Sequence, residues 1–114
     1  MAVVSNLVLD QGADFSVTVY FNQEAGIPKD LTGWTSRSQL RKSYYSTSAT
    51  TISSNISDAS NGEITLSLTA NTTANIKAGR YVYDLEVVNA ASVLRVIEGI
   101  ITVMPEVTRW LIEQ

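Results

Sequence analysis

The stretch AGRYVYDLEV, residues 78–87, alternates between two kinds of side chain with a period of two. In an extended chain Tyr81, Tyr83 and Leu85 point to one side, and the more polar residues between them point to the other. A helix does not bring alternate residues onto one face. The stretch therefore predicts a strand with one buried face, and its surroundings decide which kind of sheet it joins.

Alternating patterns recur along the chain, with turn signals between them. The candidate strands are residues 3–9, 14–21, 34–43, 63–68, 80–88 and 93–104. The Ser/Thr-rich segment 44–57 has a weak pattern, and we expect at most a short strand at a sheet edge there. Residues 22–33 are expected to be a polar loop, and Asn61-Gly62 a two-residue hairpin turn.

These elements predict an all-β fold, an immunoglobulin-like antiparallel β-sandwich of six to seven strands. Two packed sheets would bury the apolar face of every strand, whereas one flat sheet would leave an apolar face in water. One short helical turn is expected after Thr69, which would cap it, and Gly79 would end that connection.

The length of 114 residues favours a single domain, since domains commonly have roughly 100–200 residues. We place the sandwich at residues 1–105 and a C-terminal docking tail at 106–114, because Pro105 cannot continue a strand ladder. Both ends are apolar. The predicted interface residues are Val3, Val4, Trp110, Leu111 and Ile112. The alternative is that the tail folds back over its own sandwich.

The composition argues against several classes of function. The chain has no cysteine and no histidine, so it lacks a cysteine nucleophile, the usual general base near neutral pH and the common zinc ligands. The net charge is −3 and the basic residues are scattered, so we expect no nucleic-acid partner. No signal peptide or long apolar run is present, so we expect synthesis in a cytoplasm and no membrane partner. We predict no catalytic site, no cofactor and no metal.

Two structural roles are predicted around the opening stretch. Tyr81 follows Gly79 at a corner, where a tyrosine of a sandwich commonly bonds back to the backbone. Asp84 lies on the outer face of the same strand. Arg37 and Arg41 lie on the outer face of the strand at 34–43, so an ion pair across the strands with Asp84 is expected.

Three segments, taken in order, resemble a family of small structural proteins of tailed bacteriophages. They are DLTGWTSRSQLRKSYYSTSA (30–49), NGEITLSLTANTTANIKAGRYVYDLEV (61–87) and VLRVIEGIITVMPEVTR (93–109). Together they look like the N-terminal domain of the phage baseplate upper protein family and like short virion proteins of cyanophages and prophages. The resemblance covers roughly residues 7–109.

The resemblance implies a β-sandwich that docks on a larger virion assembly, with other virion proteins and further copies of itself as partners. In the baseplate family a long receptor-binding or linker region follows this domain, whereas this sequence stops at Gln114. We therefore expect a baseplate or tail adaptor, or a head cement or decoration protein, located in the virion. The alternative is a carbohydrate-binding module for host-surface adhesion, suggested by Trp34, Tyr44, Tyr45 and Tyr20.

Overall fold

A computed structural model describes residues 3–24 and 26–107. The described residues form ten strands, one 3-10 turn and one short helix. They are β1 (Val3–Val4), β2 (Leu7–Asp10), β3 (Phe15–Tyr20), β4 (Asn22–Glu24), β5 (Ile27–Pro28), β6 (Thr35–Arg41), β7 (Thr50–Asp58), η1 (Ala59–Asn61), β8 (Glu63–Leu68), α1 (Ala70–Ala74), β9 (Gly79–Val88) and β10 (Val93–Met104).

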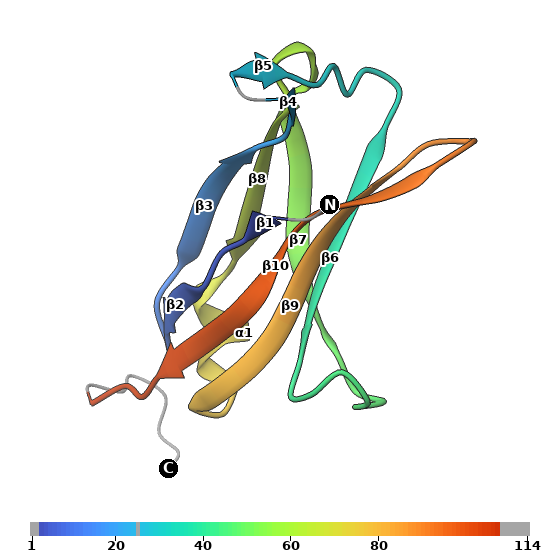
Figure 1. The fold of residues 1–114 in the computed structure, drawn as a ribbon. Helices are drawn as coiled ribbons and strands as arrows, with labels where there is room; N and C mark the ends of the chain where they lie inside the picture. The colour runs from blue at the N-terminus through green and yellow to red at the C-terminus, as the bar shows by residue number, and fades with distance from the viewer. Residues whose placement is uncertain (1–2, 25, 108–114) are drawn as a thin grey trace.

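Eight of these strands form one mixed sheet, which curls into a half-barrel (Figure 1). Its order is β1-β10-β9-β6-β7-β8-β3, and β2 pairs with β10 further along the same edge as β1. The all-β prediction is confirmed in this coarse form. The prediction of a purely antiparallel fold is wrong, because β1 and β2 both run parallel to β10.

Strand β7 makes the curl possible. Residues 50–52 pair with β6, and residues 53–58 pair with β8, so one strand joins the two halves of the sheet. The segment 44–57 therefore overlaps an internal strand of nine residues, Thr50–Asp58, and is not a short edge strand. Its pattern is weak because serine and threonine hydroxyls occupy positions that apolar residues fill elsewhere.

The strand count also exceeds the predicted six to seven. The segment 3–9 is split into two strands at Ser5–Asn6, and the expected loop 22–33 contains the β4–β5 hairpin. Gly26 has φ +77° in that hairpin, a backbone angle that favours glycine.

The core lies inside the curl and draws on both halves of the sheet. Its fully buried side chains include Leu9, Leu40, Ile52, Ile64, Leu66, Leu85 and Ile101. In β9 the inner row is Tyr83, Leu85 and Val87, as the alternation predicted, and these residues are buried. The strand therefore presents its other face to the outside.

Gly99 in β10 has a specific packing role. A Cβ atom at this position would overlap the carbonyl oxygen of Ser5, so only glycine lets the chain between β1 and β2 lie this close. Asn6 Oδ1 accepts a hydrogen bond from Ile100 N (3.0 Å), and Tyr83 Oη donates one to Ser5 O (2.6 Å). The bulge of β10 lies three residues earlier, between Arg95 and Ile97.

The short helix follows the predicted capping. Thr69 precedes α1, and its side chain accepts a hydrogen bond from Thr72 N, at 3.3 Å from Oγ1. The Asn61-Gly62 turn differs from the expected hairpin type. It is a 3-10 turn in which Gly62 alone takes a left-handed conformation, with φ +66°.

Candidate functional site

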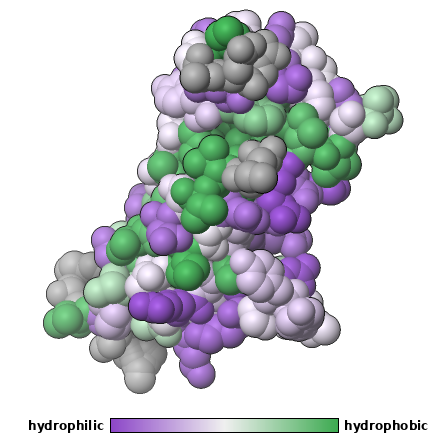
Figure 2. Space-filling view, in the orientation of Figure 1, coloured by the Kyte–Doolittle hydropathy of each residue, from purple (hydrophilic) through white to green (hydrophobic). Residues whose placement is uncertain are grey.

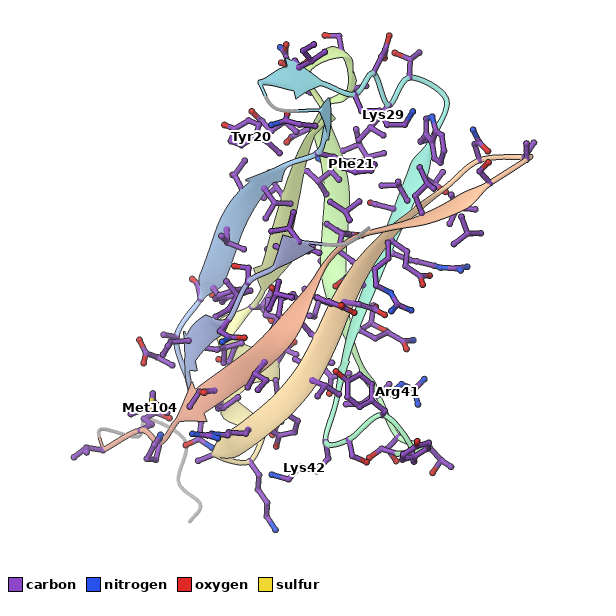
Figure 3. All side chains as sticks on the ribbon, in the orientation of Figure 1. Tyr20, Phe21, Lys29, Arg41, Lys42 and Met104 are labelled. Atoms are coloured by element: carbon purple, nitrogen blue, oxygen red, sulfur yellow. The ribbon has the colours of Figure 1, made fainter. Side chains whose placement is uncertain are left out.

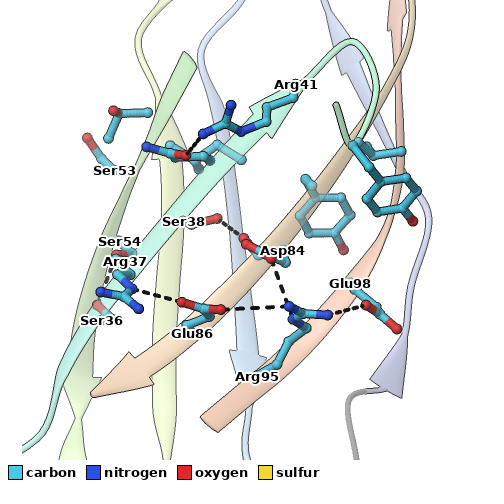
Figure 4. Close-up of a pocket in the computed structure, with 16 residues that line it drawn as sticks. Ser36, Arg37, Ser38, Arg41, Ser53, Ser54, Asp84, Glu86, Arg95 and Glu98 are labelled. Carbon is cyan, nitrogen blue, oxygen red and sulfur yellow. Dashed lines mark hydrogen bonds and ion pairs between the residues drawn. The ribbon is translucent and has the colours of Figure 1, made fainter. Parts of the chain in front are cut away.

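A hollow of the described surface lies on the outer face of β10, β9, β6 and β7 (Figure 4). Its volume is about 710 Å³. Most of the residues that line it are polar or charged. The outward side chains that line it are Arg37, Gln39 and Arg41 of β6, Thr51 and Ser53 of β7, Val82, Asp84 and Glu86 of β9, and Arg95 and Glu98 of β10, with Tyr44 beside them.

A row of ion pairs crosses this hollow from β6 to β10. Arg37 Nε lies 2.8 Å from Glu86 Oε1, because these two residues are directly opposite in the β6–β9 register. Arg95 of β10 then contacts three carboxylates, with 3.2 Å to Glu98, 3.5 Å to Asp84 and 3.9 Å to Glu86. We call these five residues the charge ladder.

The predicted pairing of Asp84 with Arg37 or Arg41 is wrong. In the observed register Asp84 faces Gln39, and Arg37 faces Glu86, so the arginine of the ion pair comes from β10 and not from β6. Arg41 turns away from Asp84 and donates a hydrogen bond to Gln39 Oε1 (Figure 4). It also donates one to Ser46 O.

The charges of the ladder do not balance, because two arginines face three carboxylates. Burial raises the pKa of Asp84 above its usual range, and the nearby carboxylates of Glu86 and Glu98 raise it further, while Arg95 and Arg37 oppose this rise. The surroundings of Asp84 thus disfavour its charged form, and an added hydrogen-bond donor or cation would stabilise that charge.

The serines beside the ladder bind one another or the backbone. Ser38 is buried and donates to the carbonyl oxygen of Asp84, and Ser36 Oγ lies 2.9 Å from Ser54 Oγ. These contacts fix β6 between β9 and β7. Sequence reasoning identified Arg37, Arg41 and Asp84, but missed Arg95 and Glu98, whose outward position depends on the β10 bulge.

The predicted corner residues lie at the lower end of β9. Gly79 begins the strand with φ +141°, and Tyr81 Oη donates a hydrogen bond to Lys77 O at 2.7 Å. The ammonium group of Lys42 lies 5.0 Å from the centre of the Tyr81 ring, a cation–π contact. These contacts fasten the turn before β9 and give Tyr81 a structural role.

A second surface feature is an apolar patch along β1, β2 and β10. Its exposed side chains are Val3, Val4, Val8, Ile100 and Met104. Figure 2 shows apolar surface over β1 and the adjoining part of β10, with hydrophilic surface directly beside it. The predicted interface residues Val3 and Val4 belong to this patch, whereas Trp110, Leu111 and Ile112 lie outside the described residues.

The four aromatic residues suggested for sugar binding are not gathered in one place. Trp34 packs partly against the core, with Lys29 Nζ 5.3 Å from its ring centre. Tyr20 stands at the upper end of β3, away from Arg41 at the hollow (Figure 3). Tyr44 and Tyr45 are exposed, and of these two only Tyr44 lines the hollow.

Comparison with known proteins finds a likeness in fold. No protein-family model matches the chain, and no curated protein matches it. The crystal structure of Listeria monocytogenes InlP is similar, with a TM-score of 0.50 and 12% sequence identity. The match covers 90% of this chain but only 28% of InlP, so this chain corresponds to a part of that protein.

The described residues contain no group of three or more acidic side chains placed to hold a metal ion. None of their helices has the length and apolar character needed to cross a membrane.

Proposed function

We propose that this chain is a non-enzymatic structural protein of a tailed bacteriophage virion. In this role it docks on a larger assembly, as a baseplate or tail adaptor or as a cement or decoration protein of the head. The immunoglobulin-like assignment is part of the proposal, because the two halves of the curled sheet face each other across one core as the sheets of a sandwich do.

The observation that carries the proposal is the apolar patch. Val3, Val4 and Val8 are 65%, 69% and 64% exposed, and they lie together along one end of the sheet. Contiguous apolar surface of this kind marks a protein interface, since exposing it to water is unfavourable. The patch adjoins the free edges of β1 and β2 in the described structure, where a neighbouring chain can add backbone hydrogen bonds.

The first test is mass spectrometry of purified particles with heads and tails separated. The proposal expects the chain in one fraction at a fixed copy number per particle. Its absence from both fractions would contradict the proposal.

The second test alters the patch. A Val8→Glu/Ile100→Lys variant places charges on the outward face of β2 and β10, and should remain folded but be lost from particles. The matched control is Ser53→Glu, an exposed change on β7 away from the patch. Normal incorporation of the patch variant would exclude this surface as the docking site. Deletion of residues 106–114 tests the predicted tail anchor in the same assay.

A second candidate function, carbohydrate binding in host adhesion, is favoured by the polar hollow. Sugars are bound by convergent hydrogen-bonding groups beside an aromatic ring, and the hollow offers Gln39, Arg41 and Asp84 beside Tyr44. Screening on a glycan array tests it. Binding that is lost in both Tyr44→Ala and Gln39→Ala would support this function, and silence on bacterial surface sugars would reject it.

A further inference from the structure

Strand β3 ends the sheet with a regular, open edge. Its six residues pair with β8 in continuous register, from Phe15 opposite Leu68 to Tyr20 opposite Glu63, without a bulge. No strand of the described chain pairs with its other edge. Figure 1 shows β3 at the left border of the molecule, with this edge turned outward.

The inward side chains of β3 are incompletely covered. Phe15, Val17 and Val19 pack against the core but remain half-buried, whereas the residues opposite them in β8 are buried. The difference arises because β8 has neighbours on both sides and β3 has one. A further strand beside β3 would cover this apolar row.

The edge also lacks the features that proteins use to keep sheet edges apart. Residues 15–20 contain no charged side chain and no proline, and the strand has no bulge. The outward row is Ser16, Thr18 and Tyr20, and Tyr20 is 61% exposed. A strand without charge does not repel an identical strand laid beside it. This property favours a second copy of the chain as the partner.

We propose that two copies of this chain pair through β3, antiparallel and around a twofold axis. With Val17 on the axis, Phe15 of each copy lies opposite Val19 of the other, and Ser16 lies opposite Thr18. The apolar row then meets an apolar row and the hydroxyl row meets a hydroxyl row, as a self-complementary interface requires. The biological meaning of this inference rests on the proposed assembly role. The inference adds a partner to that role, a second copy of the chain, and a surface, the edge of β3.

The absence of cysteine from the sequence allows a direct test with the purified chain. A Val17→Cys variant should form a disulfide-linked dimer under mild oxidation, because the introduced thiol of each copy would face that of the other across the axis. Ser53→Cys, exposed on internal strand β7, should remain monomeric under the same conditions. Equal cross-linking of both variants would overturn the proposal.

Sedimentation equilibrium gives an independent measurement. The wild-type chain should dimerise as its concentration rises. Thr18→Lys should raise the dissociation constant of the dimer by roughly tenfold or more, because the two lysines become diagonal neighbours across the axis. Thr65→Lys is the matched control, since Thr65 lies opposite Thr18 on β8, one strand inside the edge. Circular dichroism checks that both variants fold.

Two results overturn the proposal. One is a wild-type chain that is monomeric at every concentration. The other is a dimer that Thr18→Lys and Thr65→Lys weaken equally, which would place the contact elsewhere, for example on the apolar patch. Because these measurements use no particle, this inference and the virion assignment can fail separately.

Discussion

Strands β9 and β3 have the same alternating pattern, but they occupy opposite kinds of position in the sheet. β9 lies between β10 and β6, and its inner residues Leu85 and Val87 are fully buried. β3 lies at the end of the sheet, and its inner residues are only half-buried. The comparison shows that alternation determines which face of a strand is inside, while the neighbouring strands determine how deeply that face is buried.

The comparison predicts unequal costs of removing similar side chains, and this is the largest effect we expect. Leu85→Ala should lower the free energy of unfolding by about 3 kcal/mol, since Leu85 is fully buried and its removal leaves a cavity. Val17→Ala, in half-exposed surroundings, should cost about 1 kcal/mol. Urea denaturation of the monomer measures both. Equal costs would contradict the conclusion that the neighbouring strands determine how deeply an inner side chain is buried.

Strand β9 has β10 as its second neighbour, whereas β3 has no second neighbour in the described structure. The next effect concerns a close contact of β10. Gly99→Ala should lower the free energy of unfolding by about 2 kcal/mol, because the new methyl group overlaps Ser5 O and forces the backbone apart. Hydrogen exchange should show faster exchange of the Ser5 amide, which donates to Glu98 O at 2.9 Å. Unchanged exchange would show that the chain at Ser5 shifts without losing its pairing.

A smaller effect is expected from the hydroxyl groups of β9. Tyr83→Phe removes the hydrogen bond to Ser5 O and should cost about 1 kcal/mol, because the carbonyl group is left without this donor in a half-buried site. Tyr81→Phe is the matched control on the same face. It removes a bond to Lys77 O at an exposed site, where water can replace the hydroxyl, so its cost in urea denaturation should be lower. A higher cost for Tyr81→Phe than for Tyr83→Phe would contradict this interpretation.

The smallest effect concerns the outer face of β9, which carries charge where β3 carries hydroxyl groups. The pKa of Asp84 is raised above 3.8 by burial and by Glu86, so the folded chain holds this proton more tightly than the unfolded chain. The resulting stabilisation is present below pH 3.8 and is lost as the pH rises through the folded-state pKa.

Asp84→Asn removes this titration. Relative to wild type, the variant should therefore gain stability as the pH rises from acidic to neutral values, as measured by urea denaturation across this range. A relative loss of stability toward neutral pH would mean that the attraction of Arg95 outweighs burial.

Local patterns in the sequence were enough to predict some of these features. Alternation gave the correct inner and outer faces of β9 and β6, and the hydroxyl of Thr69 was correctly expected to cap a helical turn. These features depend on residues within a few positions of one another, and side-chain chemistry specifies them directly.

Features that depend on distant strands could not be predicted in the same way. The partner of Asp84 was missed because the β10 bulge between Arg95 and Ile97 changes which residues face outward. The length and internal position of β7 were missed because its hydroxyl side chains carry little hydrophobic signal, although the strand lies between β6 and β8. The candidate site was therefore only partly predictable, with its β6 and β9 residues identified and its β10 residues missed.

The pairing of β2 with β10 also has a consequence for the way the protein is made. Leu7 lies beside Ile101, so β2 can find its place only after residues 93–104 have left the ribosome. Contacts this far apart in the sequence slow folding, because a long loop must close before they form. We expect this sheet edge to form late, once residues 93–104 are free to pair with β1 and β2.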